Sequence, residues 1–384
     1  MQLIKHQTQF DFIGKRRPAV FISTVVNLAI LVGLAVFGLN LGVDFAGGTV
    51  VELKFPRAVS AEQVRREAEA GGLHDVAVQG LGAEEDHTFL LRLRGVTQLT
   101  SETGGRAEQA LRKLATLRSF EADLDNGLLN FRAETKLETE AIRQTVVAAG
   151  PSVKEVRALG AAQGGGQDYQ VVIAGLADKV GTAFSADAAK SPDFIRRVDY
   201  VGPQIGKQLR NRGVLALLYA MVAILIYVAF RFDFKFGPGA LLAMLHDVVM
   251  VVGYYVVTRR EFNLTSIAVL LTVVGYSIND TIVIYDRIRE EMGRFKGKPL
   301  AEIINIAVNA TLSRTLLTSG VTALSLVGLL IFGVGEIWDF AMAMLIGIIV
   351  GTYSSVYIAS PLTIWLDERA AARDRVGRTR PNPA

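Results

Sequence analysis

Six long apolar stretches restrict what this sequence can fold into. A run of about 20 apolar residues is long enough to cross a bilayer core of roughly 30 Å as a helix. The hydrophobic residues, 51% of the chain, are concentrated in runs at approximately 19–39, 214–230, 238–257, 264–285, 314–333 and 338–364. The sequence therefore predicts an α-helical polytopic membrane protein, with one transmembrane helix (19–39), a large polar insert (40–213) and a five-helix transmembrane bundle (214–364).

The first apolar stretch could instead be a cleaved signal peptide, because Lys15, Arg16 and Arg17 precede it. Its apolar run is longer than the core of a usual signal peptide, and its end, VFGLNLGVDF, lacks a small-residue cleavage pattern. We expect an uncleaved anchor, preceded by a cytoplasmic segment at 1–18.

Basic residues in the short loops predict the orientation of the helices. They lie before the first stretch, between the second and third, between the fourth and fifth, and in the tail at 365–384. Only Arg259 and Arg260, beside Glu261, fall on the opposite side. Because basic loops stay in the cytoplasm, we expect a multi-pass protein of the cytoplasmic (inner) membrane with both termini inside and the insert periplasmic. The net charge of +4 then needs no nucleic-acid partner.

The polar insert contains an internal repeat. The stretch beginning VVELKFPRAV aligns with the one beginning LLNFRAETKL, and each predicts strand, helix, strand, loop and strand, followed by a second helix and a short strand. We therefore expect an α+β domain of ferredoxin-like βαββαβ type, duplicated as two tandem units at about 49–125 and 127–201. The alternative is one irregular α+β domain with chance similarity. Because the chain has no cysteine, its stability must come from a hydrophobic core rather than disulfides.

No motif in the sequence predicts catalysis. The apolar stretches contain no HExxH, no Ser–Lys pair and no paired aspartates of the protease type, and no metal-ligand spacing surrounds the histidines. The glycine clusters lack the strand-to-helix context of a phosphate loop. We expect a protein that is not an enzyme and that uses neither metal nor cofactor.

Charged residues inside the apolar stretches form the candidate site. Asp280 lies about five residues from the cytoplasmic end of the fourth stretch, where a charged side chain is unfavourable by about 3 kcal/mol. Arg314 enters the fifth stretch from the same side. Two antiparallel helices would place both at similar depth, so we expect an ion pair. The alternative is that both helices end early and the charges face water.

Further polar residues suggest a seam through the membrane helices. They are Asn279, Asp247, His246, Tyr276, Thr318 and Thr322. His246 and Asp247 could also be a purely structural hydrogen-bonded pair, and Gly347 and Gly351 stand at GxxxG spacing, which predicts close helix packing. A polar seam without catalytic motifs indicates proton handling. A proton moving down a 100 mV potential releases about 2.3 kcal/mol, enough to bias a conformational equilibrium.

Several sequence elements carry a resemblance to a known family. They are FDFIGKRR, GVDFAGGTVVE (with Gly42, Asp44, Gly47, Gly48 and Glu52), LLAMLHDVV, FNLTSIAVLLTVVGYSINDTIVIYDRIREE and NATLSRTLLTSG. With these elements in this order, the chain resembles the SecF family of protein-export membrane proteins, within the resistance–nodulation–division (RND) superfamily.

The resemblance implies a function and partners. It implies a complex with SecD, beside a SecY-type channel in the lipid membrane, that uses the proton motive force to pull translocating unfolded polypeptide outward. It also implies that Asp280 and Arg314 are functional, although the main proton-carrying aspartate is usually credited to SecD. The family's extracytoplasmic domain is usually about one βαββαβ unit, so the doubled insert is a departure. The alternative function is a half-transporter of an RND-like exporter of lipids or small molecules.

Overall fold

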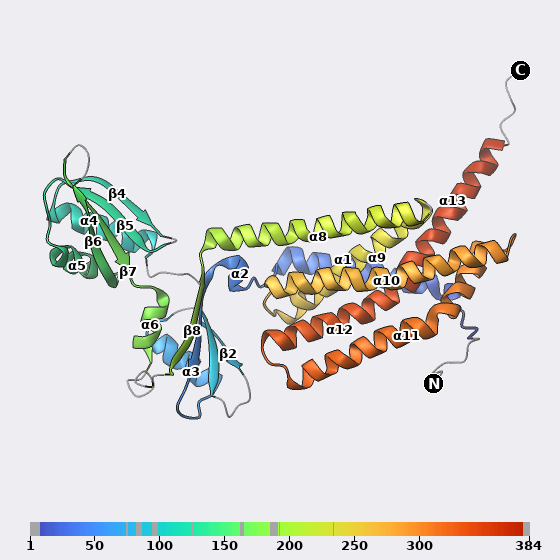
Figure 1. Cartoon of the computed structure of the whole chain (residues 1–384), viewed down its shortest axis with the longest axis horizontal. Coiled ribbons are helices and arrows are strands. Elements are labelled where there is room, and N and C mark those ends of the chain that lie inside the picture. The colour runs from blue at the N-terminus through green and yellow to red at the C-terminus, as the bar shows by residue number, and fades with distance from the viewer. Residues whose placement is uncertain are drawn as a thin grey trace, which may run out of the picture. The chain divides into compact units, whose positions relative to one another are not determined.

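The chain divides into two units, and each has its own core. The computed structural model describes residues 8–73, 76–81, 87–93, 99–124, 126–161, 165–184, 191, 193–232 and 234–378. The helical unit comprises Met1–Asn40 with Arg212–Ala384, and the α/β unit comprises Leu41–Asn211 (Figure 1).

The chain contains six helical segments that are long and apolar enough to cross a membrane, counted among the described residues. They are Ile13–Phe37, Gln204–Arg231, Gly237–Thr258, Leu264–Arg294, Leu300–Phe332 and Glu336–Arg369. The corresponding elements are η1 (Ile13–Lys15), α1 (Arg16–Phe37), α8 (Pro203–Arg231), η3 (Phe234–Phe236), α9 (Gly237–Thr258), α10 (Leu264–Arg294), α11 (Leu300–Phe332), α12 (Glu336–Ser354), a π-helical turn η4 (Ser355–Ala359) and α13 (Ser360–Arg378). The predicted arrangement of one helix, an α/β insert and five helices is confirmed.

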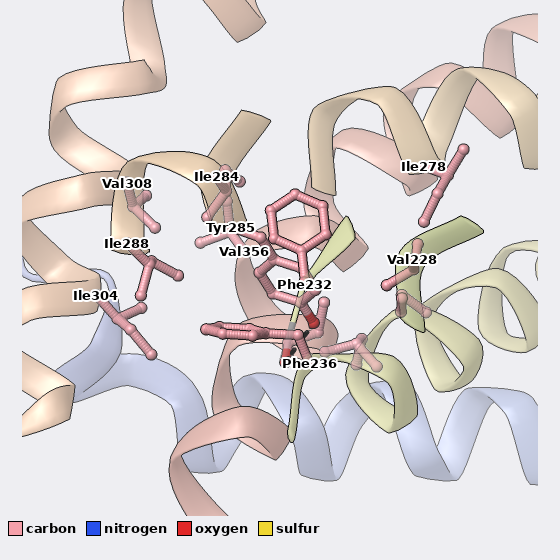
Figure 2. Close-up of a cluster of buried hydrophobic side chains, with 14 of the residues drawn as sticks. Val228, Phe232, Phe236, Ile278, Ile284, Tyr285, Ile288, Ile304, Val308 and Val356 are labelled. Carbon is pink, nitrogen blue, oxygen red and sulfur yellow. Dashed lines mark hydrogen bonds between the residues drawn. The ribbon is translucent and has the colours of Figure 1, made fainter. Parts of the chain in front are cut away.

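An aromatic cluster holds one end of the bundle together. The rings of Phe236 and Tyr285 lie 4.7 Å apart between centroids, and Phe232 packs edge-on against both. Figure 2 shows Ile304 of α11 directed toward Ile288 of α10 beside this cluster. The first turns of α11 therefore belong to the bundle core.

The opposite side of these first turns of α11 binds the segment before α1. The side chain of Asn305 accepts a hydrogen bond from the backbone N–H of Phe12, at 2.9 Å. The side-chain amide of Asn309 both accepts from Phe10 N and donates to Phe10 O. The donors and acceptors of these hydrogen bonds all belong to the helical unit. The backbone of the segment FDFIGKRR is therefore held in place by asparagine side chains of α11.

The α/β unit begins with a sheet whose last strand comes from much later in the sequence. Its elements are α2 (Val43–Ala46), β1 (Gly48–Lys54), α3 (Ala61–Ala70), β2 (Val76–Leu81), β3 (Thr88–Leu93), α6 (Leu176–Ala183) and β8 (Ile195–Val201). The strand order is β2-β3-β1-β8, and all three pairings are antiparallel. Four phenylalanines, Phe55, Phe89, Phe184 and Phe194, pack edge to face in its core. We call this set of elements the split unit.

A second sheet is formed entirely by residues between β3 and α6. Its elements are α4 (Ser101–Leu114), β4 (Leu117–Asp123), β5 (Leu128–Ala133), α5 (Thr139–Ala148), β6 (Val153–Ala161) and β7 (Gln167–Ile173), in the antiparallel order β4-β5-β7-β6. Buried residues of both helices and of the strands β4, β5 and β7 make one core that includes Leu111, Leu129, Ile142 and Val171. We call residues 99–174 the inserted unit.

The strand pairing differs from the tandem arrangement expected from the sequence. The helix and strand that follow the first copy, α4 and β4, complete the sheet of the second copy. The helix and strand that follow the second copy, α6 and β8, complete the sheet of the first. The two sheets have equivalent strand orders, so the closing strand has been exchanged between copies. Alternation predicts that a strand has a buried face, but it does not determine which of two similar sheets that face covers.

Candidate functional site

Helices α10 and α12 run parallel and pack at close range. A Cβ built on Gly351 would lie 2.8 Å from Cβ of Ser277, and one built on Gly347 would overlap the side chain of Val273. Gly347 and Gly351 are separated by the same number of residues as their partners Val273 and Ser277, as expected for two parallel helices. The two glycines therefore allow the backbones to approach, as their GxxxG spacing predicts.

Asp247 lies at the centre of the contacts between α9, α10 and α12. Its side chain is fully buried. His246 Nδ1 lies 2.9 Å from Oδ1, while the hydroxyls of Ser277 and Ser354 both donate to Oδ2, the second at 2.8 Å. Both carboxylate oxygens are hydrogen-bonded, which is what a buried carboxylate requires. The Asp247 carboxylate thus connects α9 with α10 and α12.

Sequence reasoning identified His246 and Asp247 but missed the two serines. Ser277 lies within the same apolar stretch as Asp280, and Ser354 lies at the end of α12, just before the π-helical turn. Such single π turns are frequent at functional positions. The sequence signal that could have identified Ser354 is the pair of serines at 354–355, which lies at helical spacing from Gly347 and Gly351.

Asp280 is buried, and one of its two carboxylate oxygens lacks a hydrogen-bond partner. The residue is 3% exposed, and its Oδ2 atom is buried without a partner among the residues that the structure describes. Across the antiparallel contact between α10 and α11, Tyr276 Oη lies 3.5 Å from Ser319 Oγ. Thr315, one helical turn before Ser319 on α11, also has a buried hydroxyl without a hydrogen-bond partner among the described residues.

The expected ion pair between Asp280 and Arg314 is not formed in this structure. Among the described residues, no ion pair within 4.0 Å joins Arg314 to Asp280 or to another acid, although Arg314 is close enough for its charge to act on Asp280. Arg314 is exposed. Positions 280 and 314 lie at similar distances from the cytoplasmic ends of their helices, as the sequence predicts. However, Thr315 and Ser319 occupy the face of α11 toward α10, and a step of one residue turns a side chain by about 100° around the helix axis.

The remaining seam residues fall into an inner and an outer set. Tyr276 and Thr322 are half-buried, and their hydroxyls lie 3.4 Å apart. Ser319, which sequence reasoning did not select, extends this inner set through a 2.8 Å hydrogen bond to Thr352 of α12. Asn279 and Thr318 are exposed, like Arg314. We call the three exposed side chains of this outer set, Asn279 on α10 and Arg314 and Thr318 on α11, the polar strip.

The glycine motif after α1 forms a tight turn into the first strand. Gly42 precedes α2, Asp44 lies in its first turn, and Gly47 and Gly48 have φ values of +76° and +148°. A side chain rarely adopts these backbone angles. Glu52 follows on β1 and lies 3.8 Å from Arg196 of β8. The motif therefore sets the direction in which β1 enters the sheet.

No group of three or more histidine or acidic side chains that could hold a metal ion occurs in the part of the chain that the structure describes.

Comparison with known proteins places these features in a family. Residues 183–369 match the family described as protein export membrane protein SecD/SecF, C-terminal, and residues 32–55 match the SecD/SecF GG motif. The protein translocase subunit SecF of Magnetococcus marinus is 40% identical to this chain, over 96% of this chain and 95% of that one. The chain belongs to the SecD/SecF family. The SecF subunit of Koribacter versatilis is 33% identical and covers 100% of this chain and 98% of its own length.

Solved SecD/SecF family structures share the fold. SecDF from Thermus thermophilus, a translocon-associated membrane protein, is 29% identical, with a TM-score of 0.62 over 95% of this chain. SecDF in a super-membrane-facing form is 28% identical, with a TM-score of 0.55 over 98% of this chain. This chain spans about 40% of the length of each of these SecDF chains, consistent with a subunit that corresponds to one part of a larger polypeptide.

Proposed function

We propose that this chain is an accessory subunit of the Sec translocase that joins SecD and uses the proton motive force to promote late steps of protein export. Its full-length relatives are protein translocase subunits, which supports transport of polypeptide rather than the alternative export of lipids or small molecules. The translocating polypeptide and a SecY-type channel would be its further partners.

The observation that carries the proton part of the proposal is the Oδ2 atom of Asp280. It is buried within a membrane helix and receives no hydrogen bond from any residue that the structure describes. A buried carboxylate oxygen without a donor is energetically unfavourable. A proton, a water molecule or a side chain that moves during a cycle can supply the missing donor. Asp247, by contrast, already has donors on both oxygens.

Arg314 is the proposed moving partner of Asp280. It lies on the neighbouring helix at similar depth, and its side chain is exposed. A movement of α11 that brings the Arg314 guanidinium within hydrogen-bonding distance of the carboxylate would supply the missing donor. Such a movement would couple the charge of Asp280 to a helix displacement, which is what a proton-driven step requires.

The polar strip of Asn279, Arg314 and Thr318 supports SecD as the partner on this side. Polar and charged side chains at membrane depth are unfavourable when they face lipid. In this chain alone all three are exposed, so a partner helix with complementary polar groups would cover them.

The proposed location is the inner membrane, with both termini cytoplasmic and the α/β unit periplasmic, in accordance with the basic loops. Because the natural sequence has no cysteine, single cysteines at Lys298 and Glu102 allow a direct test. An impermeant maleimide applied to intact spheroplasts should label Glu102→Cys but not Lys298→Cys, and labelling of the reverse pattern would contradict the orientation.

The functional test compares Asp280→Asn with Asp286→Asn on the same helix. Asp286 is exposed and pairs with Arg231 at 3.0 Å, so its variant has the same change in charge and a similar shape. Late-stage translocation into inverted vesicles is measured with and without a proton gradient. We expect Asp280→Asn and Arg314→Lys to associate with SecD and to retain export driven by the cytosolic motor, but to lose the gradient-dependent increment.

Asp286→Asn should keep that increment. If Asp280→Asn retains it in full as well, Asp280 has a structural role and the proton proposal is wrong. If Asp280→Asn no longer associates with SecD, the carboxylate belongs to the subunit interface instead.

A further inference from the structure

A lateral groove lies between α1, α9 and α13, on helices that do not carry the polar strip. Its volume is about 850 Å³. Exposed apolar side chains line most of its length, among them Phe21, Leu28, Leu242 and Leu245. All of these residues belong to the helical unit.

The polar groups in the groove wall already have partners within the chain. Ser23 Oγ lies 2.9 Å from Tyr353 Oη, Thr24 donates to Val20 O, and Asn27 donates to Ser23 O. Each of these side chains already makes a hydrogen bond within the chain, so the middle of the groove is suited to an apolar chain.

One end of the groove is positively charged and aromatic. Arg16 and Arg17 line it, and Arg369 stacks on the ring of Trp365 at 3.8 Å. The acid there, Glu368, lies 3.8 Å from Arg16. Two cations that line the groove therefore stand against one acid, with Arg369 adjacent on Trp365, at the level where arginine and tryptophan meet lipid headgroups.

The volume of the groove favours an acyl chain over a whole transmembrane helix as its occupant. A helix about 10 Å wide and about 30 Å long fills roughly 2,400 Å³, far more than the groove provides. Acyl chains are narrower and have no hydrogen-bonding groups to satisfy.

We propose that this groove binds an anionic phospholipid, with its phosphate at Arg16 and Arg17 and an acyl chain between α1 and α9. The lipid covers the side of His246 that lines the groove and keeps water away from the His246–Asp247 hydrogen bond on that side.

The test measures lipid binding to the full-length protein in a non-ionic detergent. Native mass spectrometry and thermal unfolding are followed while phosphatidylglycerol, phosphatidylcholine or inorganic phosphate is added. Wild-type protein should retain phosphatidylglycerol and unfold at a higher temperature with it, with at least a ten-fold preference over phosphatidylcholine and no response to phosphate.

Two variants remove the site in different ways. Arg16→Gln combined with Arg17→Gln should abolish the preference for the anionic lipid, whereas Arg289→Gln combined with Lys296→Gln, an equal change of charge elsewhere, should preserve it. Leu245→Trp fills the groove and should weaken both lipids, whereas Leu324→Trp, on an exposed position of α11, should not.

Equal loss in the matched controls, or equal binding of the two lipids to the wild type, would overturn the proposal. A photo-reactive residue at Leu245 gives an independent outcome in membranes. Crosslinks to lipid support the proposal, and crosslinks to a protein segment show that a polypeptide occupies the groove instead.

Discussion

Ser277 of α10 packs directly against Gly351 of α12, so that a Cβ at position 351 would lie 2.8 Å from the Cβ of Ser277. The same serine donates a hydrogen bond to Asp247 of α9. Close packing between two helices is thereby linked to satisfaction of a buried charge on a third.

The first prediction concerns this contact. Gly351→Leu should lower the temperature of thermal unfolding in detergent, because overpacking typically destabilises by about 1–3 kcal/mol. Gly320→Leu is the matched control, because a Cβ there meets nothing within 4 Å. If the two variants unfold at the same temperature, α10 and α12 are not in close contact at this level.

The second prediction concerns the donors to Asp247. Ser354→Ala removes one of two hydroxyls that donate to Oδ2, and loss of a donor to a buried charged group should destabilise the protein by about 1–3 kcal/mol. Ser325→Ala provides the comparison, because Ser325 is exposed and bonds only to Thr322 O of its own helix. Indistinguishable stability of the two alanine variants would argue against a structural role for Ser354.

The third prediction follows from the exchange of closing strands. Residues 99–174, expressed alone, should be soluble and should unfold cooperatively, because this segment contains all four strands, both helices and the whole core of the inserted unit. The fragment 48–124 should remain unfolded, because it contains β4 but lacks β8, the strand that completes its sheet. Circular dichroism with urea denaturation distinguishes the two, and a folded 48–124 fragment would favour the tandem arrangement.

The fourth prediction concerns Asp168 on the open face of the inserted unit. Hydrogen bonds from Arg132, at 2.7 and 3.1 Å, and its positive charge lower the pKa of Asp168. A lowered pKa means that this interaction stabilises the fold above the ordinary aspartate pKa of about 3.9 and is lost as the pH falls through the lower folded value.

In the 99–174 fragment, NMR titration should therefore place the Asp168 pKa below its ordinary value, and Arg132→Gln should raise it toward that value. Arg106→Gln, which removes a cation from α4 that lies 3.6 Å from Glu102, should leave the Asp168 pKa unchanged. An unshifted pKa in the unmodified fragment would show that the Arg132 contact is not maintained in solution.

The sequence alone determined the membrane architecture and the chemical nature of the site. Length of an apolar run is sufficient to identify a membrane-spanning helix, because the thickness of the hydrocarbon core sets that length. Asp280 could be recognised for the same reason, as a carboxylate within such a run. Gly47 and Gly48 marked a turn that requires backbone angles available mainly to glycine.

Tertiary structure decided which residues meet. Arg314 and Thr315 are neighbours in sequence and at nearly equal depth, yet only the side chain of Thr315 is buried, because packing sets the rotation of α11 about its axis. Asp247 finds its donors 30 and 107 residues away. Likewise β4 and β8 have the local pattern of strands in a tandem repeat. However, β4 completes the sheet of the second copy and β8 completes the sheet of the first. Local patterns depend on helix pitch, strand alternation and bilayer thickness, whereas these pairings depend on the shapes of surfaces that come together only when the chain folds.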